Sequence, residues 1–306
     1  MKVLVTGASG FVGAAIARFL SLQGHAVRAG ARAPAHVGTL PGVVPWALPD
    51  LAGPMVDWRP HLDGIDAVVH AAGLAHQPPD ASEASMLRLN AEAAGALAAA
   101  AAAAGINRFV LISSIRAIAG PWSTTILTET DAARPTDAYG RSKLAGEGLV
   151  RQALPTAVVL RPAVVHGAGA KANMARLARL ARLPLPLPLG GLAGRRSVVS
   201  DRNLASAAAF ALTAPGAHGR LFHVDDGAPL TLPEMIAAMR RTLGRGPGLF
   251  SPPFGLDRLL IRLAAPSLHD QLCRDFVLSS GALASTGWSP DEPSSAGLGR
   301  LVNAAR

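Results

Sequence analysis

The first thirteen residues, MKVLVTGASGFVG, constrain the fold more than any other stretch of the chain. A β-branched run is followed by glycines at positions 7, 10 and 13, and a helix-forming segment starts directly after them. This order of strand, glycine turn and helix is the context of a dinucleotide-binding fingerprint, in which main-chain N–H groups at the helix start face a pyrophosphate. We therefore predict a dinucleotide-binding turn made of Gly7, Ser9, Gly10, Phe11, Val12 and Gly13.

Strand and helix patterns alternate through the first half of the chain. The run IDAVVH at 65–70 is apolar almost throughout, which is typical of a strand buried on both faces of a parallel sheet. The pattern predicts an α/β fold, a doubly wound parallel sheet (Rossmann-like) with a smaller C-terminal α/β substrate lobe. The predicted strands lie at 25–29, 43–48, 65–70, 108–113 and 157–161, and the helices lie over 83–105 and from about residue 137.

We expect residues 1–165 to form the dinucleotide-binding domain and residues 166–306 mainly the substrate lobe. Segments at about 196–226 are expected to return to the first domain. The alternating Leu and Pro of 183–189 cannot form a regular helix, so a loop that folds over a site is predicted there. Shorter elements are predicted in this half, with strands at 198–199 and 221–224 and helices at 234–243 and 256–263.

Composition narrows the class of protein. The formal net charge is +9, but the arginines are scattered and the aromatic content is 4%, too low for a base-stacking platform, so we predict no nucleic-acid partner. No apolar run has the length of a membrane span. Because the first strand is predicted to begin at residue 3, we expect no signal peptide. The single Cys273 excludes an internal disulfide. A cytoplasmic protein without a metal is expected.

The second informative stretch is YGRSK at 139–143. A helix would place Tyr139 and Lys143 on one face, one turn apart, where the ammonium group would lower the pKa of the phenol. A phenol tuned in this way exchanges a proton with a substrate oxygen near neutral pH. Ser114 follows a predicted strand, where its hydroxyl can bind the same oxygen. Tyr139, Lys143 and Ser114 are therefore the predicted catalytic residues.

The ends of the other strands suggest how the cofactor is chosen. A carboxylate after the second strand would bind the ribose hydroxyls of NAD, whereas Gly30-Ala31-Arg32 stands here. Arg32, helped by Arg28, can bind the 2′-phosphate of NADP. We therefore predict NADP as the preferred cofactor and keep NAD as the alternative. Further cofactor contacts are predicted at Asp50 and Leu51 beside adenine, at the small residues Ala71, Ala72 and Gly73, and at Asn90 and Pro162. For Asn90, a bridging role near the lysine and a solvent-facing position are equally open.

The motifs TGASGFVG, HAAG at 70–73, SSI at 113–115, YGRSK and RPAVVHG at 161–167 resemble the extended short-chain dehydrogenase/reductases. Later stretches are similar to their nucleotide-sugar epimerase/dehydratase branch, so that the resemblance covers essentially the whole chain. These stretches are GAGAKANM (167–174), GRRSVVSDRNLA (194–205), FHVDDGAPLTLPEM (222–235) and GWSP (287–290). Within that branch the chain is most similar to bacterial UDP-sugar 4-epimerases and 4-keto reductases of surface-polysaccharide synthesis.

The resemblance implies that Tyr139 is the acid/base, that Lys143 holds the ribose and that Ser114 orients the substrate oxygen. It also implies that Asn173 and Arg196 contact the UDP moiety, and that the protein is a homodimer through the helices around 91–105 and 139–150. Ala31 departs from the family pattern, since most 4-epimerases have an acidic residue there, and this argues against permanently bound NAD. Ile115 and Arg116 stand where a dehydratase has an acidic pair.

The leading hypothesis is an NAD(P)-dependent enzyme that moves hydride between nicotinamide and C4 of a UDP-linked sugar, as an epimerase or a keto reductase. A second enzyme hypothesis is the NADPH-dependent reduction of a non-sugar ketone by the same three side chains. A hypothesis from another class is a non-catalytic sensor that binds the dinucleotide without turnover. The Tyr139 and Lys143 pair argues for chemistry.

Overall fold

The computed structural model describes residues 1–38, 40–51, 53, 56–74, 82–255, 261–263 and 266–305. Its main sheet has seven strands, all parallel to their neighbours, in the order β10-β6-β5-β4-β1-β2-β3. The strands are β1 (Lys2–Thr6), β2 (Ala26–Ala31), β3 (Val43–Ala47), β4 (Ala67–His70), β5 (Arg108–Ile112), β6 (Val158–Pro162) and β10 (Leu221–Val224). The chain winds outward from β1 in both directions, and the doubly wound parallel sheet predicted from the sequence is confirmed.

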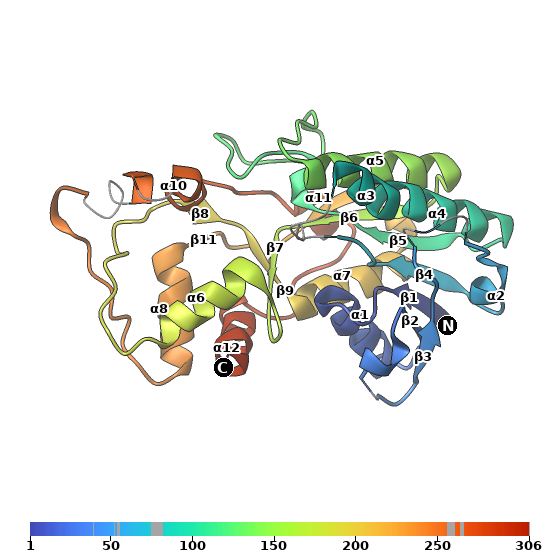
Figure 1. Ribbon diagram of the computed structural model, residues 1–306, viewed down its shortest axis with the longest axis horizontal. Helices are drawn as coiled ribbons and strands as arrows, with labels where there is room; N and C mark the ends of the chain where they lie inside the picture. The colour runs from blue at the N-terminus through green and yellow to red at the C-terminus, as the bar shows by residue number, and fades with distance from the viewer. Residues whose placement is uncertain are drawn as a thin grey trace.

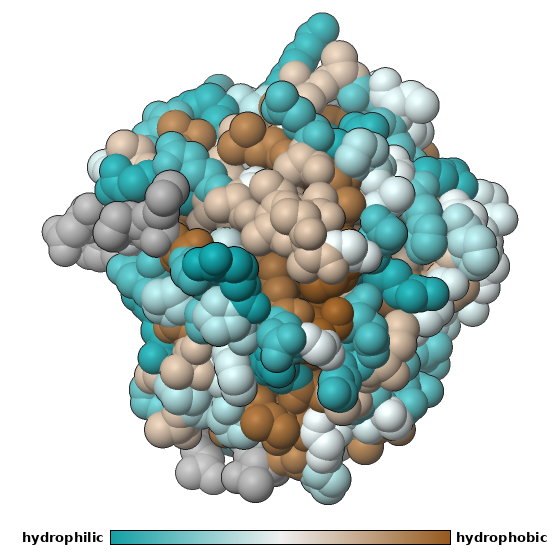
Figure 2. All heavy atoms as spheres, turned by 90° about the vertical axis from the view of Figure 1, so that its right-hand side faces the viewer, coloured by the Kyte–Doolittle hydropathy of each residue, from teal (hydrophilic) through white to brown (hydrophobic). Residues whose placement is uncertain are grey.

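Helices cover both faces of this sheet, as Figure 1 shows. Alternate residues of β1 point to opposite faces, so Val3 and Val5 join the core beneath α1 and α7, and Leu4 joins the core beneath α4 and α5. One face carries α1 (Phe11–Leu22) and α7 (Asp201–Thr213), and the other carries α2 (Arg59–Leu62), α3 (Glu83–Leu87), η2 (Arg88–Glu92), α4 (Ala93–Ala103) and α5 (Ala138–Ala153). The end of the molecule near α2, β3 and α4 shows a band of hydrophobic residues between hydrophilic ones (Figure 2).

The helix predicted over 83–105 is divided. It begins as α3, continues as the π-helical turn η2 around Asn90, and resumes as α4. A π turn adds a residue to the helical repeat and is frequent at functional sites. It places the backbone of Asn90 against α5, where a Cβ added to Gly146 would lie 2.2 Å from the Asn90 carbonyl oxygen. Glycine at position 146 is therefore required for this close approach.

The second half of the chain forms a lobe and also contributes to the sheet. β10 pairs with β6 and α7 packs on α1, whereas α6 (Ala172–Arg182), α8 (Leu232–Thr242) and α12 (Ser294–Ala304) enclose a separate apolar core. Two short sheets join β7 (Val164–His166) to β9 (Val198–Ser200) and β8 (Arg195–Arg196) to β11 (Leu230–Thr231). The remaining elements are η1 (Pro34–His36), η3 (Ile115–Ala117), η4 (Pro215–Ala217), η5 (Pro253–Gly255), α10 (Pro266–Cys273) and α11 (Gly281–Ala284).

Several sequence expectations differ from this architecture. The helices α6, α7 and α12 were not predicted from the sequence, and the helix predicted at 234–243 begins earlier, at Leu232. Five residues of the helix predicted over 256–263, namely 256–260, lie outside the described residues. Within the described part of the chain, no helix combines the length and the apolar character that crossing a membrane requires.

The Leu-Pro segment 183–189 is a loop, and a buried arginine holds it. Arg240 on α8 is 3% exposed, and its guanidinium donates to main-chain carbonyls before the loop, within the loop and on the neighbouring segment 247–248. Its Nε donates to Ala181, its Nη2 to Leu183 and Leu185, and its Nη1 to Pro247 and Gly248, at 2.8 to 3.1 Å. Prolines cannot donate main-chain hydrogen bonds, so a side chain with several donors replaces the regular pairing that this loop lacks.

We expect Arg240→Met to destabilise the protein by about 3–5 kcal/mol, because it removes five hydrogen bonds to main-chain carbonyls, one of them buried and four partly buried. Urea unfolding followed by circular dichroism measures the change. The neighbouring Arg241 is exposed, so Arg241→Met is the matched control and should change the free energy of unfolding by less than about 0.5 kcal/mol. Equal effects of the two variants would contradict the role assigned to Arg240.

Candidate active site

The glycine turn joins β1 to α1 at the carboxyl edge of the sheet. Gly7 has a φ of +71°, and a Cβ added there would lie 2.7 Å from the Ala72 nitrogen; a Cβ on Gly13 would lie 2.2 Å from the Gly7 carbonyl oxygen. Ser9 and Gly10 are exposed at the start of α1. The helix has no side-chain cap at Gly10 and no acidic residue in its first turn. These features fit a phosphate group at the positive end of the helix.

The small residues after β4 lie against this turn. Thr6 Oγ1 contacts His70 Nδ1 at 2.8 Å and accepts a hydrogen bond from the Ala72 N–H at 3.3 Å. His70 is 1% exposed, and burial together with the nearby Lys143 charge lowers its pKa to about 3. A neutral histidine therefore helps to fix the 71–73 segment, a role that the sequence analysis did not identify.

Tyr139 and Ser114 meet at the edge of the sheet. Tyr139 lies in the first turn of α5, which is capped by Asp137, whose carboxylate accepts from the Gly140 N–H at 2.7 Å. Ser114 follows β5 and a side-chain hydrogen bond joins it to Tyr139. Burial raises the pKa of Tyr139, whereas the bond with Ser114 and the charge of Arg116 act in the opposite direction.

The expectation that Lys143 lowers the pKa of Tyr139 is therefore wrong for this structure. The Lys143 ammonium donates to the Ile112 carbonyl at 3.0 Å, and it is not among the groups that shift the tyrosine. Desolvation of the phenol raises its pKa more than its contacts with Ser114 and Arg116 lower it. The four-residue spacing between Tyr139 and Lys143 does not reveal this effect. Burial lowers the pKa of Lys143 itself to about 8, and the Glu147 carboxylate counteracts this effect.

Asn90 joins the 71–74 segment to α5. Its side-chain oxygen accepts from the Leu74 N–H at 2.9 Å, while its Nδ2 donates to the Leu74 carbonyl and, at 2.9 Å, to Ser142 Oγ. Ser142 Oγ donates in turn to the carbonyl of Tyr139. A Cβ on Gly73 would lie 2.7 Å from Asn90 Oδ1 and 3.0 Å from Lys143 Nζ, so all these groups converge. Of the two positions left open for Asn90, the structure has the bridging one, since the residue is 2% exposed.

A network of buried charged side chains lies next to Lys143, between α5, β5 and β6. Glu147 lies one turn after Lys143 and accepts from Ser113 Oγ. Arg161 on β6 binds the same carboxylate with two hydrogen bonds, from Nε at 2.9 Å and from Nη2 at 2.6 Å. Side chains of Glu147 and Arg161 are 4% and 7% exposed. The four-residue spacing between Lys143 and Glu147 was a signal that the sequence analysis did not use.

The residues predicted to contact the cofactor near β2 and β3 differ in their exposure and in their partners. Arg32 is exposed just after β2, as a ligand for a 2′-phosphate must be. Arg28 donates to the His61 carbonyl at 2.8 Å and stacks on the Trp46 ring, so it does not help Arg32 as expected. Leu51 is buried and Asp50 is exposed at the end of the segment after β3, and Pro162 is buried at the end of β6.

The expected substrate residues lie in the lobe. Asn173 is exposed near the start of α6, directly after Ala172, which has a φ of +51°. Arg196 donates through Nη1 to the Gln271 carbonyl and through Nη2 to the Pro121 carbonyl, the latter at 2.8 Å. Burial and the charge of Arg116 lower its pKa to about 10. Arg116 acts on both Tyr139 and Arg196, so the lobe and the catalytic edge share one electrostatic environment.

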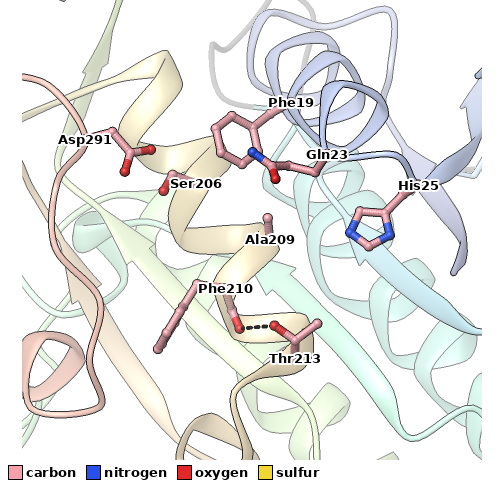
Figure 3. Close-up of a pocket in the computed structure, with 8 residues that line it drawn as sticks. All are labelled: Phe19, Gln23, His25, Ser206, Ala209, Phe210, Thr213 and Asp291. Carbon is pink, nitrogen blue, oxygen red and sulfur yellow. Dashed lines mark hydrogen bonds between the residues drawn. The ribbon is translucent and has the colours of Figure 1, made fainter. Parts of the chain in front are cut away.

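A hollow of 360 Å³ lies elsewhere, between the end of α1 and α7. Figure 3 shows Phe19, Gln23 and His25 facing Ser206, Ala209, Phe210 and Thr213, with Asp291 at its side. It lies near the amino end of β2, whereas the ligand crevice of a parallel sheet is at the carboxyl ends of the strands. We do not assign this hollow to the site.

The fold and the glycine turn define a Rossmann-type, dinucleotide-dependent enzyme. The chain belongs to the NAD dependent epimerase/dehydratase family, whose model matches residues 3–224. It is 29% identical to a UDP-glucose 4-epimerase of Vibrio cholerae over 99% of this chain and 95% of that protein. It is 31% identical to a 3-diazoavenalumate denitrifying reductase of a Streptomyces species over 98% of this chain and 100% of that protein.

Among solved structures, the human epimerase family protein with NADPH is similar, with a TM-score of 0.74 and 22% identity over 99% of this chain and 98% of that one. The family and fold inferred from the sequence motifs are confirmed, as is the cofactor class, NAD or NADP. The individual site residues stay predictions.

Glu147→Gln should shift the alkaline limb of the turnover–pH profile to lower pH by about one unit, because an opposite charge that raises the pKa of Lys143 is lost. The ammonium is charged below its pKa of about 8 and is lost above it, so activity should decline from a lower pH in the variant. Steady-state rates across a pH series measure this effect. Ser113→Ala keeps the carboxylate and should leave the limb in place; a shift in both variants would contradict an electrostatic role.

Proposed function

We propose that the protein transfers hydride between a nicotinamide cofactor and C4 of a UDP-linked sugar, with Tyr139 as the proton donor and acceptor. The observation that carries this proposal is the convergence of Tyr139, Ser114 and Lys143 at the carboxyl edge beside the glycine turn. When bound, the nicotinamide supplies or accepts the hydride. Both a released keto-reduction product and a closed epimerase cycle use this step.

In the proposed reaction, Ser114 orients the substrate oxygen and Tyr139 exchanges the proton with it. The raised pKa of Tyr139 keeps the phenol protonated, which suits a proton donor to a forming hydroxyl. Lys143, whose ammonium lies near Gly73, holds the ribose of the bound cofactor. Asn90 positions the 71–74 segment by its two bonds to the main chain of Leu74, and its bond to Ser142 Oγ connects that segment to α5, which carries Lys143.

We expect Tyr139→Phe to reduce turnover by about 10²–10⁴-fold while cofactor affinity stays unchanged, because it removes only the exchangeable proton. Stopped-flow hydride transfer and fluorescence titration with the cofactor measure the two quantities. Ser114→Ala should have a smaller effect on turnover. A Tyr139→Phe enzyme with full activity would refute the assignment, and no turnover in wild-type protein with any tested carbonyl would favour the sensor hypothesis.

For the cofactor, we propose NADP in preference to NAD. The residues 26–38 contain no carboxylate that could bind a ribose 2′-hydroxyl, and Arg32 is exposed at the end of β2. A guanidinium binds a phosphate with directed, charge-assisted hydrogen bonds.

Arg32→Ala should weaken NADPH binding by at least tenfold and leave NADH binding nearly unchanged. Isothermal titration with both cofactors gives the comparison. Arg151→Ala, at an exposed position near the end of α5, is the control for a general loss of positive charge. Equal losses for NADPH and NADH would disprove the role of Arg32.

A UDP-linked sugar is proposed because of the Vibrio cholerae relative and the predicted roles of Asn173 and Arg196. A specific observation favours a second candidate, the reduction of a non-sugar ketone. Both terminal nitrogens of Arg196 already donate to main-chain carbonyls, so a diphosphate would have to replace these bonds. The Streptomyces relative is named as a reductase of 3-diazoavenalumate, which is not a nucleotide sugar.

Binding of UDP to the protein distinguishes the two candidate substrates, the UDP-linked sugar and the non-sugar ketone. If the lobe binds the diphosphate, millimolar UDP should raise the melting temperature by several degrees through mass action, and Arg196→Ala should remove this effect. Scanning fluorimetry is the measurement, with uridine as the control without phosphate. No shift with UDP would favour the ketone reductase. Mass spectrometry of ligands released from purified protein would then separate an epimerase with retained NAD from a reductase with exchangeable NADPH.

The cellular setting is part of the proposal. We propose a cytoplasmic homodimer that serves polysaccharide synthesis, with α4 and α5 forming the contact. These helices lie side by side above the sheet in Figure 1, and Leu149 on α5 is 39% exposed while it packs on Gly95 of α4.

A further inference from the structure

Three large hydrophobic side chains, Leu183, Leu185 and Phe250, project into solvent from the lobe; we name them the apolar edge. They are 43%, 63% and 50% exposed. Main-chain bonds bring the two segments together, since the Leu187 N–H donates to the Gly248 carbonyl and the Phe250 N–H donates to the Leu187 carbonyl. In Figure 1 these segments form the left end of the molecule, the end opposite α2 and β3.

The apolar edge is held rigidly. Arg240 binds the carbonyls of Leu183 and Leu185 from inside the lobe, and the same guanidinium binds Gly248 on the neighbouring segment. A loop fixed in this way cannot fold its leucines inward. Hydrophobic side chains that stay exposed to water cost free energy when the loop cannot move to bury them. A fixed group of exposed hydrophobic side chains is typical of an interaction site.

The two segments that carry the apolar edge are rich in positive charge. The stretch 171–190 has four basic residues and the stretch 235–255 has three, and neither has an acidic one, in a chain whose formal net charge is +9. All of them except Arg240 are exposed. Arg245 donates to the carbonyl of Arg182 at 2.7 Å, which places a guanidinium beside Leu183. Two segments without a carboxylate thus combine exposed leucines with cations.

This combination is the chemistry of a surface that inserts apolar side chains among anionic headgroups. A symmetric contact with a second copy would place the same cationic surface against itself, which is unfavourable. Nucleic acid would use the cations but gains nothing from the leucines. We propose that the apolar edge and its flanking arginines dock the protein peripherally on an anionic lipid bilayer, with Leu183, Leu185 and Phe250 at the acyl boundary.

Co-sedimentation with vesicles tests the proposal. We expect the full chain to bind vesicles of phosphatidylglycerol and phosphatidylcholine in equal parts and not vesicles of phosphatidylcholine alone. Leu185→Glu should weaken the binding at least tenfold, and so should Arg179→Gln combined with Arg245→Gln. Both variants change exposed side chains, so their melting temperatures should equal that of the wild type.

Matched controls lie on the other domain. Leu22 is 75% exposed at the end of α1, and Arg88 and Arg151 are exposed on η2 and α5. Leu22→Glu, and Arg88→Gln combined with Arg151→Gln, should bind anionic vesicles as the wild type does. The proposal is overturned by absence of binding, by equal binding to both vesicles, or by equal losses in the controls. It is also overturned if the sole effect of Leu185→Glu is to convert a dimer to a monomer. A third contradicting result is unchanged vesicle binding by Leu185→Glu together with equal RNA binding by this variant and the wild type.

Discussion

Two opposite charges, Lys143 and Glu147, are buried on successive turns of α5, and the position of Tyr139 depends on how these charges are compensated. An isolated charge in a protein interior is costly, so each must find partners that stay fixed. Lys143 donates to the carbonyl of Ile112 on β5, and Glu147 binds Ser113 after β5 and Arg161 on β6. The helix is thereby attached to two neighbouring strands. This attachment also fixes the position of Tyr139, which lies one turn before Lys143.

Much of the fold was predictable because its signals are local. The glycine turn, the apolar strands and the Tyr139 to Lys143 spacing depend on short-range geometry, and the seven-stranded parallel sheet agrees with them. The helices α6, α7 and α12 were missed for different reasons. Apolar residues recur at helical spacing in α6, at Met174, Leu177 and Ala181, so a signal was present there and was not used. The helices α7 and α12 are rich in small residues, and their buried faces are evident only where they pack on α1 and α8.

The chemistry of the site was less predictable, since it depends on which groups meet and how deeply they are buried. The four-residue spacing places Lys143 near Tyr139 but does not reveal that desolvation dominates the pKa of the phenol. Arginines present the same difficulty. Arg28 stacks on Trp46, whereas Arg32, four residues later, stays in solvent. Arg196 and Arg240 bind main-chain carbonyls of loops, so each stabilises the lobe where regular pairing is absent.

Tyr139 is the only tyrosine in the chain, and its phenol lies in the proposed site. Ultraviolet difference absorbance of ionising phenol therefore originates from a single oxygen atom in this protein. The wild-type protein carries an intrinsic chromophore at the proposed reaction centre, and the protonation state of this phenol is open to direct spectrophotometric titration without isotope, label or mutation.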